Sequence, residues 1–364
     1  MIVQDVINYI EELCPLAYAE DFDNVGLLVG NKNDHIKGVL VTLDTLENVV
    51  DEAIEKKCNL IVSFHPIIFS GLKKITGSNY VERVVLKAIK NNISIYAMHT
   101  ALDNCFTGVN AEICNVLGLK NQKILIPQQG TIKKLTTYVP KKNADKVREA
   151  LFNAGAGNIG NYSNCSFNLE GTGTFNGNEN SNPVIGERGK TQEETEIQIG
   201  VTYAKHVENN VLNALFKHHP YEEIAYEIFT LENTNQHIGM GMIGELNNTM
   251  NETEFLKFIK KKMNTGCIRH SELLGKKIKK VAVLGGSGAF AIKHAKRLGA
   301  DIFITSDIKY HEFYQAENKM IIADIGHYES EQFTKTLLVR YLTKKIPNFA
   351  IVLSISNTNP VKYL

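Results

Sequence analysis

Hydrophobic and polar residues follow two alternating patterns over the first 120 positions of the chain. Three short apolar runs have the length and composition of buried strands, at 39–43, 60–64 and 93–98. The stretches between them, 48–57 and 81–91, place apolar residues at helical spacing. Strands that alternate with helices in this order predict a largely parallel sheet that is covered by helices.

The last 90 residues show the same style of alternation. Short apolar runs predict strands at 278–284, 302–305, 320–325 and 350–355. Amphipathic stretches predict helices at 289–298, 309–318 and 330–342. The two ends of the chain therefore predict two lobes of one α/β class.

The middle of the chain has a different character. It predicts strands at 133–139, 197–203 and 224–231 and helices at 144–155 and 207–217. A repeated strand–helix–strand order is typical of a ferredoxin-like α+β module. Residues 165–200 are polar and glycine-rich, with the low-complexity run GTGTFNGNENSN, and are expected to be mobile. The break in composition on both sides predicts an insertion, with domains at 1–127, 128–236 and 237–364.

Composition limits the classes of function. The 364 residues have a formal net charge of +1, which gives no reason to expect nucleic acid or an anionic membrane as a partner. No apolar run is long enough to span a bilayer, and the first residues lack the pattern of a signal peptide. The six cysteines form no CxxC pair, which argues against thiolate zinc sites and favours reduced thiols in the cytoplasm.

Candidate chemistry gathers where the predicted strands end. Parallel sheets collect functional groups beyond the carboxyl ends of their strands. Three such ends are followed by a histidine, and two of these histidines have a carboxylate four residues later. The residues concerned are His65, His99 with Asp103, and His327 with Glu331. On a helical turn, residues four apart share one face, so each pair can converge on one point.

Imidazole nitrogens and carboxylate oxygens suit divalent zinc, iron or manganese, and a carboxylate can bridge two ions. Each residue also has a purely structural interpretation. An isolated histidine after a strand can cap or hydrogen-bond, Asp103 can belong to a turn, and Glu331 can favour a helix dipole. Their recurrence at three strand ends favours a site for one or two transition-metal ions.

Other motifs are less specific. Gly285, Gly286, Ser287 and Gly288 follow a predicted strand and could cradle a phosphate or a carboxylate, but they could equally form a tight turn. Asp307 and His311 could orient ligands or transfer protons, and the alternative is a helix cap. The turn at 23–26 could line the site. The pair His218 and His219 resembles a ligand pair, but a structural turn is favoured there.

Five motifs occur in the order found in a known family. They are FDNVGLLVG (22–30), VSFHPIIF (62–69), MHTALDN (98–104), SDIKYH (306–311) and DIGHYESE (324–331). The whole chain resembles the NIF-three-like proteins, also called the dinuclear metal centre family and known as GTP cyclohydrolase I type 2 homologues. HPYEEIAY (219–226) resembles the PII/CutA-like module that longer bacterial members contain.

The resemblance implies two α/β lobes that face one cleft, with the inserted PII/CutA-like α+β domain, and assembly as a toroidal homohexamer. It implies metal ligation by His65, Asp103, His327 and Glu331, with His99 close by. One position departs from the pattern, because Phe64 replaces the first of two histidines that many bacterial members have. An aromatic ring cannot replace an imidazole ligand, so a mononuclear site stays open as an alternative.

These observations predict a metal-binding protein with a hydrolase-like site. Zinc is the first choice of metal, His311 or Asp307 would transfer protons, and the substrate would be a nucleotide or another small phosphorylated molecule. The alternative is a non-enzymatic metal-binding or regulatory protein whose PII-like module senses a ligand. A catalytic site keeps an open coordination position, whereas a structural site is closed. The absence of a DNA-reading motif argues against direct nucleic-acid binding.

Overall fold

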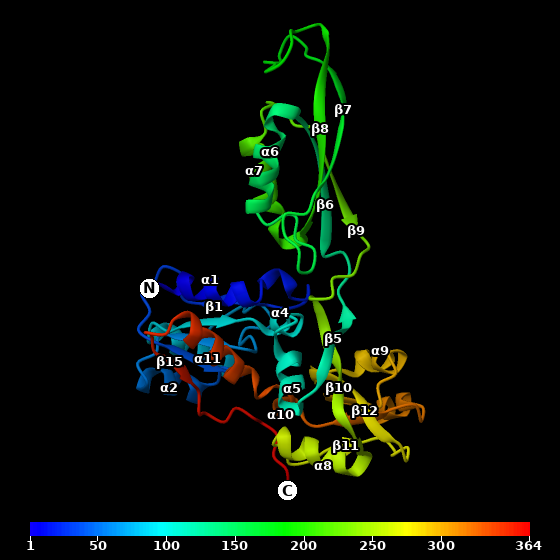
Figure 1. Cartoon of the computed structure of the whole chain (residues 1–364). Helices are drawn as coiled ribbons and strands as arrows, with labels where there is room; N and C mark the ends of the chain where they lie inside the picture. The colour runs from blue at the N-terminus through cyan, green and yellow to red at the C-terminus, as the bar shows by residue number, and fades with distance from the viewer. The chain divides into compact units, whose positions relative to one another are not determined.

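The computed structural model describes all 364 residues, and the chain forms two compact units (Figure 1). The core unit consists of Met1–Pro127 and Gln236–Leu364. The inserted unit consists of Gln128–Asn235. No helix has the length and apolarity that a bilayer crossing requires.

The first sheet of the core unit has five strands in the order β1-β4-β3-β2-β15. Its strands are β1 (Gly26–Val29), β2 (Val39–Thr42), β3 (Leu60–Ser63), β4 (Ser94–Ala97) and β15 (Ile351–Leu353). All neighbours are parallel except β1 and β4. Strands β2, β3 and β4 are buried along their whole length, which explains why they appear in the sequence as unbroken apolar runs.

Helices cover both faces of this sheet, and alternate strand residues point to each cover. Leu40 and Ile61 pack with α2 (Glu47–Glu55) and α3 (Tyr80–Lys90). Val39 and Val41 belong to the core that includes residues of α1 (Val3–Leu13) and α11 (Thr334–Lys345).

The second sheet has six strands in the order β11-β14-β13-β12-β10-β5. Its strands are β5 (Lys120–Pro127), β10 (Gly239–Asn251), β11 (Arg269–His270), β12 (Lys277–Ser287), β13 (Ile302–Ser306) and β14 (Ile321–Asp324). The strands β12, β13 and β14 are parallel and central. The remaining core helices are α4 (His99–Asp103), α5 (Val109–Leu117), α8 (Glu252–Lys262), α9 (Ile292–Arg297) and α10 (His327–Glu331), with short 3₁₀ turns at Leu16–Tyr18 and Ala289–Ala291.

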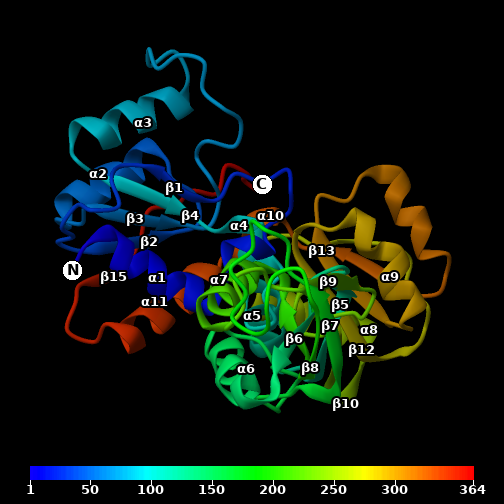
Figure 2. The same ribbon diagram turned by 90° about the horizontal axis from the view of Figure 1, so that it is seen from above.

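Neither sheet is built from one contiguous stretch of chain. Strand β15, near the C-terminus, pairs with β2, and β5 from the first third of the chain pairs with β10. One hydrophobic core contains Val41 of the first sheet together with Val281 and Ile302 of the second. The two sheets therefore share a core and form one unit. Figure 2 shows the strands of both sheets from above.

The inserted unit is a four-stranded antiparallel sheet in the order β7-β8-β6-β9, with two helices. Its elements are β6 (Ile132–Pro140), α6 (Ala144–Asn153), β7 (Phe167–Asn176), β8 (Thr191–Ala204), α7 (Glu208–His218) and β9 (Tyr226–Leu231), with 3₁₀ turns at Lys141–Asn143 and Lys205–Val207. This βαββαβ order is the ferredoxin-like connection. The core packs between the sheet and both helices, around Leu135, Ile199, Val211 and Leu215.

Two predicted elements differ from the structure. The expectation of a mobile segment over 165–200 is wrong for β7 and the start of β8, because these strands pair over ten consecutive residue pairs, from Phe167↔Gly200 to Asn176↔Thr191. Backbone hydrogen bonds of a hairpin do not depend on apolar side chains, so the polar composition concealed it. The helix expected at 309–318 is a 3₁₀ helix at Tyr310–Ala316.

Candidate metal centre

The carboxyl ends of the parallel strands in both sheets meet at the candidate site. His65 follows β3, and His99 begins α4 directly after β4. His327 begins α10, which follows β14 of the second sheet, and Glu331 ends it. Convergence of each four-residue pair requires a helical turn, and the structure has one at His99–Asp103 and one at His327–Glu331.

Three of the five predicted ligands converge within one coordination sphere. One ligand atom from each of His65, His327 and Glu331 lies within 4.8 Å of the others. Glu331 Oε2 lies 3.1 Å from His65 Nε2 and 3.2 Å from His327 Nε2. The Glu331 side chain is 3% exposed, and this oxygen has no hydrogen-bond partner. A buried carboxylate oxygen between two imidazole nitrogens is a strong sign of a cation-binding site.

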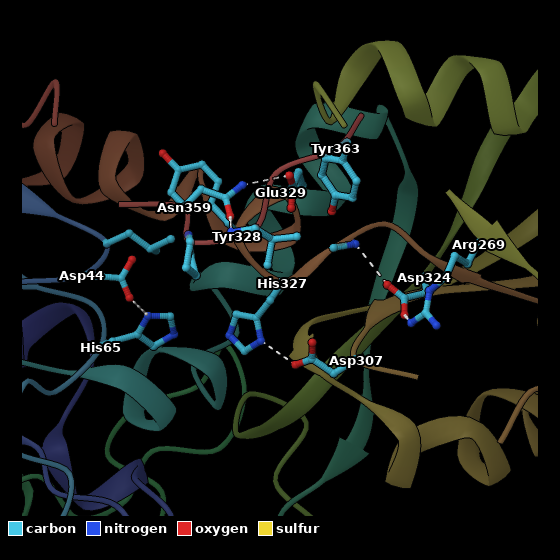
Figure 3. A pocket seen from close by; sticks show the side chains of 14 residues that line it. Asp44, His65, Arg269, Asp307, Asp324, His327, Tyr328, Glu329, Asn359 and Tyr363 are labelled. Carbon is cyan, nitrogen blue, oxygen red and sulfur yellow. Dashed lines mark hydrogen bonds and ion pairs between the residues drawn. The ribbon is translucent and has the colours of Figure 1, made fainter. Parts of the chain in front are cut away.

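The Nδ1 atoms of His65 and His327 are each held by a carboxylate, as Figure 3 shows. His65 Nδ1 lies 2.8 Å from Asp44 Oδ1, and His327 Nδ1 lies 2.6 Å from Asp307 Oδ2. A carboxylate on Nδ1 fixes the tautomer in which Nε2 presents its lone pair, and it increases the basicity of the imidazole. Both Nε2 atoms therefore point toward Glu331 as ligands would.

The electrostatics of the metal-free cluster favour charged groups. Burial alone would lower the pKa of His65, but the charges of Glu331 and Asp44 raise it to about 10. Burial also opposes protonation of His327, and the carboxylates of Asp307 and Glu331 beside its ring raise its pKa to about 11. Burial would raise the pKa of Glu331, whereas His65 and His327 lower it to about 2. The protons on the imidazoles thus take the place that a cation would occupy.

Asp103 and His99 lie beside this triad without joining its atoms. Asp103 is half-buried, and desolvation of its carboxyl together with the charge of Glu331 raises its pKa well above the usual range. Its Oδ1 also lacks a hydrogen-bond partner. The His99 ring lies 5.2 Å from the His65 ring, and its Nδ1 lies 2.9 Å from Asp23 Oδ1. Phe64 is buried between them, with its ring 4.9 Å from that of His65 and 5.6 Å from that of His99.

Asp23 belongs to the turn at 23–26, which is a candidate from the sequence for the lining of the site. It also accepts hydrogen bonds from the backbone N–H and the hydroxyl of Thr100, at 3.0 and 2.5 Å. Burial would raise the pKa of Asp23, but these bonds and His99 lower it to about 2. Asp23 is therefore an ionised residue that orients His99.

Two N–H groups of the glycine-rich segment, the candidate anion cradle, donate to side chains of the protein. The segment comprises Gly285, Gly286, Ser287 and Gly288. The N–H of Gly285 donates to Asn110 Oδ1 at 3.0 Å, and the N–H of Gly286 donates to Ser330 Oγ at 2.9 Å. These two donors are thus already used within the protein. A Cβ on Gly286 would lie 2.4 Å from Glu331 Oε1, so the glycine makes room for the buried carboxylate.

Asp307 and His311, the two predicted proton-transfer residues, lie in different surroundings. Asp307 lines the cavity beside the triad and holds His327. His311 is exposed on the 3₁₀ helix after β13, where its ring packs against Tyr310 at 5.1 Å and Tyr314 at 6.2 Å. It does not line the cavity. The structure therefore supports a positioning role for Asp307 and offers no contact through which His311 would act at the triad.

A cavity of about 410 Å³ opens beside the triad (Figure 3). Its wall includes His65, His327 and four residues near the C-terminus, Asn359, Pro360, Val361 and Tyr363. Its charged residues are Asp44, Arg269, Asp307, Asp324 and Glu329. Arg269, the only lysine or arginine in this wall, is paired with the buried Asp324. The wall therefore favours cations over anions.

Sequence reasoning missed Asp44 and Thr358. Asp44 follows β2 at the same sheet edge, so the rule that identified His65 and His99 could have found it. Thr358 donates to Asp44 Oδ2 at 2.7 Å and thereby supports the residue that holds His65. Nothing in the local sequence pattern indicates this contact, because it depends on β15 returning the C-terminus to the first sheet.

Replacing Asp44 by asparagine is expected to weaken zinc binding about ten- to a hundredfold, because His65 loses the carboxylate that fixes its tautomer. Isothermal titration of metal-free protein with zinc measures the change. Asp34→Asn makes the same charge change at an exposed position and should leave zinc affinity as in the parent. An Asp44→Asn variant with parental zinc affinity would show that the Asp44 carboxylate does not support zinc binding through His65.

Fold and site together define a mixed α/β protein of several sheets with a histidine–carboxylate cluster compatible with a metal ion. The sequence profile of the Duf34/NIF3 (NGG1p interacting factor 3) family matches residues 1–360. The chain belongs to this family.

Curated relatives agree over the full length. A Bacillus subtilis protein named GTP cyclohydrolase 1 type 2 homolog is 41% identical over 99% of this chain and 98% of its own. A protein of the same name from Halalkalibacterium halodurans is 40% identical, over 99% and 98%. Each is a homologue by name, so the name does not establish a reaction for this chain.

Solved structures agree as well. The chain is similar to a Bacillus cereus protein related to NIF3, with a TM-score of 0.87 and 36% identity over 100% of this chain and 99% of the other. A Staphylococcus aureus protein matches with a TM-score of 0.80 and 32% identity, over 100% and 99%. The complete fold is therefore shared with both.

Proposed function

We propose that this protein binds a divalent transition-metal ion through His65, His327 and Glu331, at a site of the kind used for hydrolysis. The observation that supports this most directly is Glu331 Oε2, which is buried without a hydrogen-bond partner between two imidazole nitrogens. Two histidines and one carboxylate form a donor set that zinc, iron and manganese accept, with zinc the first choice.

Three protein ligands leave room for a further one, and the cavity beside them gives access to it. A metal held there would supply Lewis acidity and would lower the pKa of a coordinated water. The chain's own residues hold this site in place. Asp44 and Asp307 orient the two imidazoles, and Gly286 leaves the space into which Glu331 fits.

A second ion is part of the proposal. Asp103 Oδ1 is a buried acceptor without a partner, and His99 is oriented by Asp23 close to His65. Since Phe64 offers no ligand atom, this second position would rely on Asp103, His99 and a bridging Glu331. We therefore expect one ion per chain on the triad and a second, more weakly bound ion beside it.

The names of the relatives suggest GTP as substrate, and the cavity wall gives limited support to a triphosphate. Carboxylates outnumber cations there, Arg269 is already paired, and the N–H groups of Gly285 and Gly286 are used. This composition favours a second candidate function, metal binding without turnover. Hydrolysis of GTP and of simple phosphate esters by the zinc-loaded protein separates the two, because only the hydrolase releases product.

Two further expectations follow from the resemblance. The βαββαβ order of the inserted unit supports a PII/CutA-like module that regulates the site by binding a ligand. The toroidal homohexamer is expected from the family pattern, and native mass spectrometry of the full chain would test it.

Zinc binding near neutral pH is expected to release about two protons per ion, because His65 and His327 are protonated in the metal-free protein and must lose their protons to bind metal. Titration calorimetry in two buffers that differ in ionisation enthalpy measures the number. Affinity should fall as pH is lowered, since protons and metal compete for the same nitrogens. Binding without proton release, or no binding of zinc, iron or manganese, would contradict the proposed site.

A further inference from the structure

The inserted unit contains a cavity of its own, of about 300 Å³. Five segments line it: the end of β7, the hairpin loop before β8, Glu196 of β8, Tyr138 of β6, and the loop between α7 and β9. All of them lie within Gln128–Asn235. Figure 1 shows the long β7–β8 hairpin that forms one side. The cavity is therefore independent of the metal centre.

Its charged groups all have one sign. Glu196, Glu222 and Glu223 line the cavity, and no lysine, arginine or histidine does. The nearest histidine ring, His219, is buried; burial lowers its pKa, and its ring nitrogens are used by Tyr138 O and by the N–H of Tyr221. No positive charge of the lining balances the glutamates.

Glu196 is the distinctive member of this group, because its residue is only 8% exposed. One carboxylate oxygen, Oε1, accepts a hydrogen bond from the Tyr221 hydroxyl at 2.8 Å. Burial and Glu196 both raise the pKa of that hydroxyl, so it stays a neutral donor. The other oxygen, Oε2, has no hydrogen bond, and a Cβ on Gly173 would lie 2.2 Å from it. A largely buried carboxylate with one neutral partner gains stability from a cation beside it.

The rest of the wall is aromatic and aliphatic. Tyr138, Phe175 and Tyr221 contribute rings, and the rings of Phe175 and Tyr221 lie 5.8 Å apart. Pro183, Val184 and Ile185 of the hairpin loop add apolar surface. Aromatic faces attract organic cations, and apolar surface accommodates their carbon skeleton. Hard divalent metals bind through oxygen ligands and would leave this aromatic and aliphatic surface unused.

We propose that this cavity binds a small organic ammonium ion with an apolar body, and that Glu196 is its counter-ion. The ammonium group hydrogen-bonds to the free oxygen of Glu196 and lies against the rings of Phe175 and Tyr221, while its hydrocarbon part contacts Val184 and Ile185. Glycine at position 173 keeps the carboxylate accessible beside β7.

Calorimetric titration of the full, metal-free chain with 2-phenylethylammonium chloride tests this, with 2-phenylethanol as the neutral matched ligand. The ammonium ion is expected to bind one per chain with a Kd below about 1 mM. Glu196→Gln should weaken binding about ten- to a hundredfold, because a hydrogen bond to a charged group is lost. Glu149→Gln, the same change at an exposed position of α6, should bind as the parent does.

Val184→Trp fills the cavity from an exposed loop position and should also abolish binding, which covers the case that Glu196→Gln does not fold. The proposal fails if the parent does not bind the ammonium ion, if the alcohol binds equally well, or if Glu196→Gln binds like the parent. Displacement of the ammonium ion by calcium chloride at equal concentration would identify a metal site instead and would overturn it too.

Discussion

Glu331→Gln is expected to lower zinc affinity more than a hundredfold. Loss of a supporting residue costs about ten- to a hundredfold, and Glu331 is the proposed ligand between both imidazoles. Glutamine has nearly the same shape but lacks the negative charge. Titration calorimetry and metal content after dialysis measure the loss.

The same variant should change how the stability of the metal-free protein depends on pH. The pKa values of His65 and His327 are raised from 6.5 to about 10 and about 11, so their ion pairs stabilise the folded state fully below pH 6.5. That contribution is lost as pH rises through 10. Glu331, with its pKa lowered to about 2, contributes above pH 4.5 and loses its effect as pH falls toward 2. The free energy of unfolding of the parent should exceed that of Glu331→Gln by the largest amount between pH 4.5 and pH 6.5.

Glu112→Gln is a matched control, because Glu112 is also buried and paired, with Arg340. It is expected to reduce stability and to leave zinc affinity unchanged. If Glu331→Gln and Glu112→Gln lowered thermal stability alike and neither altered zinc binding, Glu331 would be a structural carboxylate and the metal centre would lie elsewhere.

Gly286→Ala should damage the site without removing any ligand. The residue has φ of +71°, where a side chain costs about 1–2 kcal/mol, and the added Cβ would lie 2.4 Å from Glu331 Oε1. The buried Glu331 must move, so zinc affinity is expected to fall more than tenfold and the melting temperature to drop. Calorimetry and thermal unfolding with and without zinc measure both effects.

Gly299→Ala separates backbone strain from displacement of the carboxylate. Gly299 has the same φ of +71°, and a Cβ there would meet nothing within 4 Å. It should cost about the same 1–2 kcal/mol of backbone strain while zinc affinity stays parental. Equal zinc affinities in the two variants would mean that Gly286 does not serve the position of Glu331.

The sequence by itself determined the elements at the centre of each sheet and most of the candidate ligands. Strands such as β2, β3 and β13 are buried on both faces, so their apolar runs are visible without any tertiary information. The ends of these strands are visible in the local sequence. The four-residue spacing of His327 and Glu331 indicates that both side chains lie on one face of a helix. Local periodicity and strand ends are therefore enough to identify these residues.

Only the tertiary structure decided how those residues meet and what supports them. Asp44 reaches His65 because β2 and β3 pair in the first sheet, and Thr358 reaches Asp44 because β15 joins that sheet from the far end of the chain. In the sequence, Gly286 belongs to a segment that resembles an anion-binding turn. In the structure, it leaves space for the side chain of Glu331, which comes from α10. The hairpin β7–β8 could not be predicted from the apolar pattern, because its backbone hydrogen bonds form regardless of its polar side chains. Contacts between residues distant in the chain depend on packing, which no local pattern of residues records.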